Sequence, residues 1–279
     1  ALVVFSAIGG FAIAGGNPAV LLHLSEFVVV GGMSAGMLVI ASPKSTMMRL
    51  ISDVKTAFQG GGADPDEFMD LMKLLYELFM VGRRNGLIAL DEHVTEPENS
   101  TILSRYPTFL ADPERVEFLC NGLRPIIDGK IKPEQLEELL DNEIYSKEQQ
   151  AHEPVKVLNL IGDSLPGIGI CAAVLGVINT MSSVSEGPEV VGKKVAAALT
   201  GTFLGVYGAY GFVNPLAMRV QSQHSNHFLY FTTMSQAISG FAKGLAPLMA
   251  IEIARRSLVR EVQPEADELE NLLKGLAKK

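Results

Sequence analysis

The sequence predicts an all-α membrane protein with four transmembrane helices and a large helical cytoplasmic insert between helices 2 and 3. Four stretches contain no Asp, Glu, Lys or Arg, and these are residues 1–25, 27–43, 164–185 and 195–218. A helix needs about 20 mostly apolar residues to cross a bilayer core about 30 Å thick, and it satisfies its own backbone polar groups there. The stretches form two pairs on either side of a charged segment, which predicts the insert.

Residues 1–43 are expected to hold transmembrane helices 1 and 2. The chain starts inside an apolar run without Met or a basic leader. This start favours a span that has lost its first turn, a truncated N-terminus, over a cleaved signal peptide. Glu26 lies at the edge of the second span, where we interpret it as an interfacial acid, with a place in a proton relay as the alternative.

The insert, residues 44–160, is expected to be helical. Helix-start signals occur at Asp64-Pro65, Asp112-Pro113 and Lys132-Pro133, where proline would take the first helical position. The first signal is followed by apolar residues at 3.6-residue spacing, which are Phe68, Leu71, Met72, Leu75, Leu78 and Phe79. No period-two pattern typical of strands stands out.

The distribution of basic residues predicts the orientation. Most Lys and Arg residues lie between 44 and 156 or from 219 to the end, whereas residues 14–22 contain none. Cytoplasmic segments carry an excess of Lys and Arg, so the insert and the C-terminal helical tail, residues 219–279, are expected in the cytoplasm. An even number of spans places the N-terminus there too.

Composition argues against several other functions. With 31 acids and 23 bases the net charge is -8, which disfavours nucleic acid as a partner. Residues 162–165 spell an esterase-like Gly-Asp-Ser-Leu, but no Asp-x-x-His follows to supply a general base. His224 and His227 lack further metal ligands nearby in the sequence. We therefore expect no enzyme activity, no metal and no cofactor.

The last two spans, which lie in residues 161–218, have charge-free stretches without a titratable acid that could bind an ion. The stretches 164–185 and 195–218 contain no Asp, Glu, His, Lys or Arg, so if ions move here, the carboxylate that binds them would come from another chain. Small residues recur every four positions in the last span, at Ala197, Gly201, Gly205 and Ala209. Such a face lets helices approach closely, either within this chain or against a partner.

Two prolines, Pro166 and Pro215, lie at matching ends of these spans. Proline removes a helical hydrogen bond and clashes with the preceding turn, so each would form a simple bend or a hinge. Their matching depth favours the hinge.

Several motifs, taken together, resemble the MotA family of flagellar stator subunits. The motifs are residues 83–90 (RRNGLIAL), 104–107 (SRYP), 162–169 (GDSLPGIG), 172–180 (AAVLGVINT), 201–205 (GTFLG) and 209–217 (AYGFVNPLA), and the resemblance covers essentially the whole chain in order.

The resemblance implies a ring of such subunits, a pentamer around a MotB dimer, in the bacterial inner membrane. An Asp of MotB would bind the travelling ion against the third and fourth spans. Pro166 and Pro215 match the family's functional prolines and would couple ion binding to motion. Thr202 and Ala173 would line the ion path, to which Asp163 and Tyr210 are also assigned.

The resemblance also bears on the ion. Sodium-type relatives tend to have Thr where this chain has Ala173, because Na⁺ is coordinated by additional oxygen ligands. Ala173 offers no side-chain oxygen, which favours H⁺, with Na⁺ as the alternative.

The rotor contact is also implied by the resemblance. Arg83 and Asp91 match charged positions that act on the rotor protein FliG. Glu92 follows Asp91 where the family usually has a single Glu, so either acid or both could carry the contact. From the residues alone, these charges would be solvated groups at a helix end.

Two other functions remain as alternatives. An ExbB- or TolQ-type energiser of outer-membrane processes would use a similar ring, but those relatives have one span before the large cytoplasmic segment rather than two. The other alternative is a membrane scaffold without ion flux.

Overall fold

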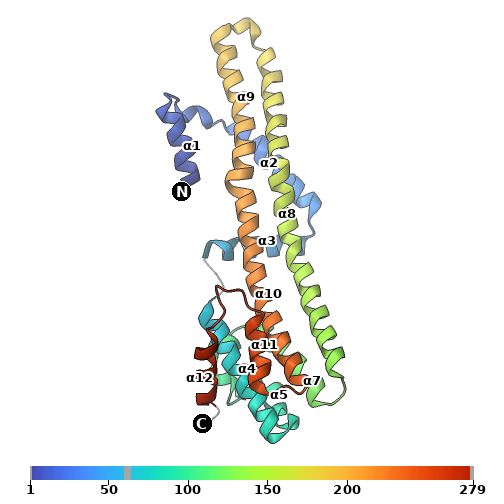
Figure 1. The fold of residues 1–279 in the computed structure, drawn as a ribbon. Coiled ribbons are helices and arrows are strands. Elements are labelled where there is room, and N and C mark those ends of the chain that lie inside the picture. Colours follow the sequence, from blue (N-terminus) through green and yellow to red (C-terminus); the bar gives the residue numbers. More distant parts are fainter. Residues whose placement is uncertain (1, 60–63, 277–279) are drawn as a thin grey trace. The chain divides into compact units, whose positions relative to one another are not determined.

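The computed structural model describes residues 2–59 and 64–276, and the regular elements within these ranges are all helical. The chain divides into two compact units. Unit 1 comprises residues 1–60 and 151–222, and unit 2 comprises residues 61–150 and 223–279. Two long helices, α8 (Pro133–Met181) and α10 (Asn214–Ala242), contribute residues to both units (Figure 1). The expectation of an all-α chain is thus confirmed for the described residues.

Unit 1 contains the charge-free helices. In addition to parts of α8 and α10, its elements are α1 (Leu2–Ile13), η1 (Pro18–Leu21), α2 (Leu24–Ala41), α3 (Lys44–Gln59), η5 (Val184–Glu186), α9 (Pro188–Gly208) and η6 (Ala209–Val213). The connection from η5 to α9 turns at Gly187, whose φ of +101° favours glycine, and Pro188 then opens α9.

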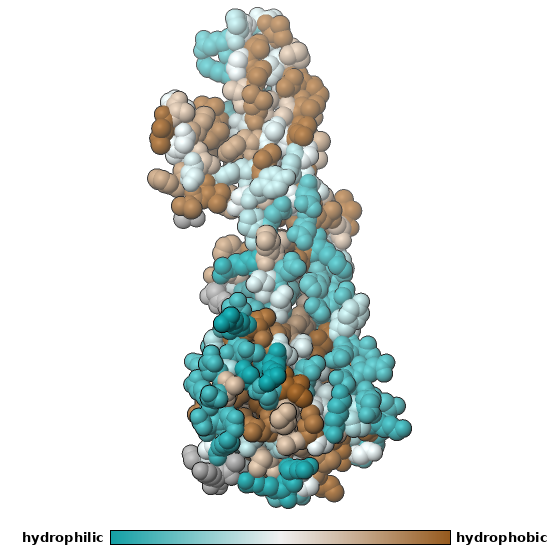
Figure 2. Space-filling model, viewed as in Figure 1, coloured by the Kyte–Doolittle hydropathy of each residue, from teal (hydrophilic) through white to brown (hydrophobic). Residues whose placement is uncertain are grey.

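Three helical segments among the described residues are long and apolar enough to cross a membrane, namely Pro18–Ala41, Pro133–Met181 and Pro188–Ala242. The apolar helix Leu2–Ile13, at 12 residues, is shorter than a full span. Hydrophobic residues cover much of the surface over α1, whereas hydrophilic residues form much of the surface over unit 2 (Figure 2). The structure therefore supports several helical membrane spans, and the fourth span stays a prediction.

Unit 2 begins with the helix starts that the sequence predicts. Asp64 caps α4 by accepting a hydrogen bond from the Asp66 amide at 3.0 Å, and Asp112 caps α7 by accepting one from the Glu114 amide at 3.0 Å. Helix α8 starts at Pro133, as expected. The elements of unit 2, besides parts of α8 and α10, are α4 (Pro65–Asn85), η2 (Leu87–Leu90), α5 (Asp91–Thr95), η3 (Pro97–Asn99), η4 (Leu103–Arg105), α6 (Pro107–Leu110), α7 (Pro113–Ile127), α11 (Pro247–Arg256) and α12 (Ala266–Leu276).

The core of unit 2 is built around one face of α4. The six apolar side chains predicted to share this face, from Phe68 to Phe79, are all buried. The Phe79 ring stacks on Phe241 of α10 with a centroid distance of 4.4 Å, and Phe118 of α7 meets Phe231 of α10 edge to face at 5.1 Å. Unit 2 thus has a core of large side chains, which is typical of a domain that folds in water.

The SRYP motif at residues 104–107 serves this packing. Arg105 forms an ion pair with Glu77 of α4, and the Tyr106 hydroxyl donates a hydrogen bond to the same carboxylate at 3.0 Å. Burial, together with the charge of Glu77, raises the pKa of Tyr106 far above its ordinary value, so this hydroxyl keeps its proton. The motif therefore fixes the loop before α6 on α4.

Candidate functional site

The candidate site in unit 1 is the contact between α8 and α9, where the two backbones touch. A methyl group built on Gly169 would lie 2.8 Å from the Gly201 carbonyl oxygen and 3.0 Å from Gly205 Cα. A methyl group on Gly205 would lie 2.5 Å from the Leu165 carbonyl oxygen. These distances leave no room for a larger side chain, so the small residues noted in the sequence serve contact within this chain at this point.

Ala173 and Thr202 lie at this same contact. A methyl group on Gly201 would lie 3.2 Å from the Ala173 nitrogen, and one on Gly169 would lie 3.2 Å from Thr202 Cα. Both side chains are half-buried. The structure thus brings together the two residues that the resemblance assigns to the ion path.

The two prolines flank a second close contact. Gly162 of α8 faces Val213 and Asn214, and a methyl group on Gly162 would collide with the Asn214 amide oxygen. Gly162 lies one helical turn before Pro166, and Asn214 directly precedes Pro215. The segment just before Pro215, η6, is a π-helical turn, a feature that bends helices and recurs at functional sites. Helix α8 continues through Pro166 without interruption.

Asp163 and Tyr210 are not part of these buried contacts. The side chain of Asp163 is exposed, and Tyr210 is 66% exposed. Their assignment to the ion path therefore stays a prediction.

Glu26 of α2 is more deeply placed than its position at a span edge suggested. It is only 6% exposed, and a methyl group on Gly201 of α9 would lie 2.6 Å from its Oε2 atom. Within the described part of the chain, Oε2 has no hydrogen-bond partner, and the Ser25 hydroxyl donates to Oε1 at 3.4 Å. The signal in the sequence was its position as the single charge between two charge-free stretches.

The candidate charged surface in unit 2 lies where α4 ends and α5 begins. Arg83, Asp91 and Glu92 are all exposed, and the chain turns between them at Gly86, where φ is +88°. The Thr95 hydroxyl donates to Asp91 Oδ1 at 3.3 Å, and Glu92 Oε1 lies 3.5 Å from His93 Nε2. The ion pairs found among the described residues do not join Arg83 to either acid.

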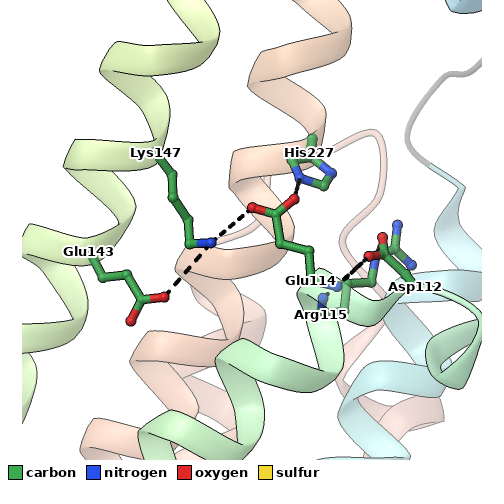
Figure 3. Close-up of polar contacts among 6 residues, drawn as sticks. All are labelled: Asp112, Glu114, Arg115, Glu143, Lys147 and His227. Atoms are coloured by element: carbon green, nitrogen blue, oxygen red, sulfur yellow. Dashed lines mark hydrogen bonds and ion pairs between the residues drawn. The ribbon is translucent and has the colours of Figure 1, made fainter.

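An ion-pair network in unit 2 was missed by the sequence analysis. Glu114 at the start of α7 accepts a hydrogen bond from Lys147 of α8 at 3.0 Å and contacts His227 of α10 at 3.3 Å (Figure 3). Burial raises the pKa of the Glu114 carboxyl, but Lys147 and His227 together outweigh burial and hold it below its ordinary value. The three residues are far apart in the sequence, so no local pattern could reveal the network.

The helical fold, the candidate spans and the glycine contacts define the class of protein. The chain is an all-helical membrane protein with several candidate spans, and its charge-free helices pack through glycine. A family model described as "MotA/TolQ/ExbB proton channel family" matches residues 111–233, and one described as "Motility protein A N-terminal" matches residues 1–86.

Individual relatives narrow the class. The chain is 30% identical to motility protein A of Salmonella typhimurium over 275 residues, covering 99% of this chain and 93% of the relative, and equally similar to motility protein A of Escherichia coli. It is also similar to the C. jejuni MotAB structure, with a TM-score of 0.77, 25% identity and 93% of each chain covered. The Bacillus subtilis flagellar MotAB stator complex, at 20% identity and a TM-score of 0.74 over 97% of this chain and 96% of that one, shares the fold.

The chain therefore belongs to the MotA family of flagellar stator subunits. This membership confirms the resemblance and the expectation of a motor and channel component rather than an enzyme.

Proposed function

We propose that this chain is a flagellar stator subunit that works with a MotB-type partner to conduct protons across the inner membrane and drive rotation of the flagellar rotor. The observation that carries the proposal is family membership along nearly the whole chain, with relatives named motility protein A and a similar fold in MotAB structures. The proton channel family as a whole also contains the TolQ and ExbB types, so the motility relatives favour the stator over an energiser of outer-membrane processes.

The proposed arrangement has four spans. Residues 1–43 and 161–218 each supply two, the insert at 44–160 and the tail at 219–279 lie in the cytoplasm, and both termini lie there too. The three long apolar segments support three of the spans, and Leu2–Ile13 supplies the described part of the fourth. The excess of Lys and Arg in the insert and tail supports the orientation.

The ion path is proposed to lie beside the α8 and α9 contact. Because the charge-free stretches of these helices have no acid, the carboxylate that takes up the ion is assigned to the MotB-type partner. Ala173 and Thr202 would face it. With only one side-chain oxygen between them, H⁺ is the proposed ion, and Na⁺ would need further ligands.

Pro166 and Pro215 are proposed as conformational couplers. Each lies about one turn or less from the contact of Gly162 with Asn214, and the π-helical turn η6, a kind of turn that tends to bend helices, lies beside Pro215. Small shifts at this contact would therefore be passed into α8 and α10.

The output of the motor is assigned to charged residues. Arg83 with Asp91, Glu92 or both would contact oppositely charged residues of FliG, and their exposure leaves them accessible to a partner. A pentamer of this chain around a MotB dimer, as the family resemblance implies, completes the proposed assembly.

The test is motility in the chain's own host, with its stator genes deleted and this chain supplied together with its MotB-type partner. Pro166→Ala should abolish swimming although the protein is inserted and assembled, because alanine restores a regular helix and removes the coupler. Pro154→Ala is the matched control, since Pro154 also lies inside α8 but outside the proposed path.

Two outcomes would contradict the proposal. Normal swimming with Pro166→Ala would remove Pro166 from the mechanism. Failure of the wild-type pair to restore swimming in its own host would favour the ExbB- or TolQ-type energiser.

A further inference from the structure

Helix α3 has an exposed face with apolar and basic side chains. This face has no role in the packing or in the stator function described above. Lys44, Met48, Ile51, Lys55 and Phe58 follow one another at spacings of four and three residues, which places them on one side of the helix; we call this side the outer face of α3. Met48, Ile51 and Phe58 are 61%, 59% and 79% exposed. Three large apolar side chains on one short helix are costly to leave in water.

The adjacent face of α3 is already covered by unit 1. Leu50 and Ala57 are buried in a cluster with Val155, Leu158, Ala217 and Val220, and Val54 packs against it. Arg219 of α10 also donates a hydrogen bond from Nε to the Ala57 carbonyl oxygen at 2.6 Å. Helix α3 is thus held firmly, and its outer face is presented in a fixed direction.

These contacts place α3 at the edge of the apolar region. The cluster residues of α10 lie where the charge-free stretch 195–218 ends, and those of α8 lie just before the stretch 164–185 begins. Helix α3 itself starts three residues after the candidate span Pro18–Ala41. The end of α2 and the cluster residues of α8 and α10 thus all lie at the boundary of the apolar region, beside α3.

The charges on the outer face indicate the partner. Lys44 and Lys55 are exposed, and within the described residues neither forms an ion pair. Lysine can lay its alkyl chain along an apolar surface while its ammonium group reaches the headgroups. An amphipathic helix with apolar and basic residues binds at the interface of an anionic leaflet, and the cytoplasmic leaflet is anionic.

We propose that the outer face of α3 lies in the headgroup boundary of the cytoplasmic leaflet and binds anionic phospholipid, with Met48, Ile51 and Phe58 among the acyl chains and the two lysines at the phosphates. This lipid contact would fix the depth of the proline-bearing helices through the α3 cluster. The inference depends on membrane insertion and not on torque, so it can fail or hold independently of the stator function.

The chain contains no tryptophan, which makes a site-specific test possible. The full chain is reconstituted with its partner in vesicles of phosphatidylcholine and phosphatidylglycerol, and Phe58→Trp supplies a reporter after subtraction of the emission of the unsubstituted complex. Ser45→Trp is the matched control, because Ser45 is exposed on α3 away from the outer face. We expect brominated lipid to quench the tryptophan at 58 strongly and the one at 45 weakly.

The preference for anionic over zwitterionic lipid tests whether Lys44 and Lys55 contact the phosphates. Brominated phosphatidylglycerol should quench the tryptophan at 58 more than brominated phosphatidylcholine does. Lys44→Gln and Lys55→Gln should each lower this preference about fivefold. Lys193→Gln, a loss of the same charge at the start of α9, should leave the preference unchanged.

Three results would overturn the proposal. Lack of quenching with free access of aqueous iodide would place the face in water. Lack of quenching without iodide access would mean that protein, such as a second copy of this chain, covers it. Equal quenching by both lipids would remove the anionic partner.

Discussion

The helices inside unit 1 and the helices inside unit 2 are held together by opposite kinds of contact. In unit 1, α8 and α9 meet through backbone atoms at Gly169 and Gly205, whereas in unit 2 α4 and α10 meet through the stacked rings of Phe79 and Phe241. Lipid tails are as apolar as leucine, so burial of large side chains does little to bring spans together, and close backbone approach takes its place. In water the burial of large side chains is the main stabilising contribution. The packing of each unit therefore agrees with the solvent proposed for it.

Ion pairs between helices also differ between the two units. Glu114 joins α7, α8 and α10 in unit 2 through Lys147 and His227, and Arg115 of α7 joins α4 through Glu67 at 2.9 Å. The charge-free stretches of unit 1 have no such links. A helix contact made without ion pairs or large interlocking side chains can shift with little loss of specific interactions, which suits the movement proposed for these helices.

The largest effect should come from opening the core of unit 2. Phe79→Ala removes a ring that is fully buried and stacked at 4.4 Å on Phe241, and such a change costs about 3–5 kcal/mol. Thermal unfolding of the purified chain in detergent should show a large drop in Tm. Tyr145→Ala is the control, because Tyr145 of α8 is 62% exposed and its loss should shift Tm little. Equal drops for the two variants would mean that unit 2 lacks the proposed core.

A smaller effect should come from adding one methyl group to the backbone contact of unit 1. Gly169→Ala places a methyl 2.8 Å from the Gly201 carbonyl oxygen, and overpacking of this kind costs about 1–3 kcal/mol. Gly167→Ala is a close control on the same helix, because a methyl there meets nothing within 4 Å. Swimming speed and Tm should both fall for the first variant and hold for the second. If Gly169→Ala swims normally, the contact is looser than described and does not constrain the movement proposed for these helices.

Much of the fold could be predicted from local sequence. The starts of α4, α7 and α8 follow from Asp64-Pro65, Asp112-Pro113 and Pro133, and the buried face of α4 follows from its spacing of apolar residues. These signals are local because capping and periodicity act within one or two turns. The charge-free stretches predicted four spans, and three helical segments among the described residues are long and apolar enough to be spans.

The site was less accessible to prediction. The resemblance placed Ala173 and Thr202 on the same path, but their position beside Gly169 and Gly201 needed the helices in three dimensions. Glu26 stood out as a single charge between two charge-free stretches, but its burial against α9 joins segments distant in the sequence. The contacts of Glu114 also join distant segments, and they leave no local pattern. The π-helical turn before Pro215 also lacks a reliable sequence signal.

The smallest effect concerns a buried histidine of unit 2, which lies outside the candidate spans. His93 is 3% exposed, and its Nδ1 atom lies 2.8 Å from the Ser100 hydroxyl oxygen. That oxygen accepts hydrogen bonds from the amides of Ile102 and Leu103 at 3.3 and 3.1 Å. The single hydroxyl proton is then free to point at Nδ1, which fits a neutral imidazole.

The sign of the pH dependence follows from this environment. Burial lowers the pKa of His93 below its ordinary value of 6.5, although Glu92 raises it in part. In the unfolded chain this histidine takes up a proton near pH 6.5, whereas in the folded chain it does so only at lower pH. The contribution of neutral His93 to the free energy of unfolding is therefore fully present above pH 6.5 and declines as the pH falls below it. Tm measured from pH 7.5 down to pH 5.5 should fall less steeply for His93→Gln than for the wild type, even if the variant starts lower. Parallel pH profiles would mean that His93 accepts its proton in place, and the hydrogen bond with Ser100 would then have to run from the imidazole to the hydroxyl.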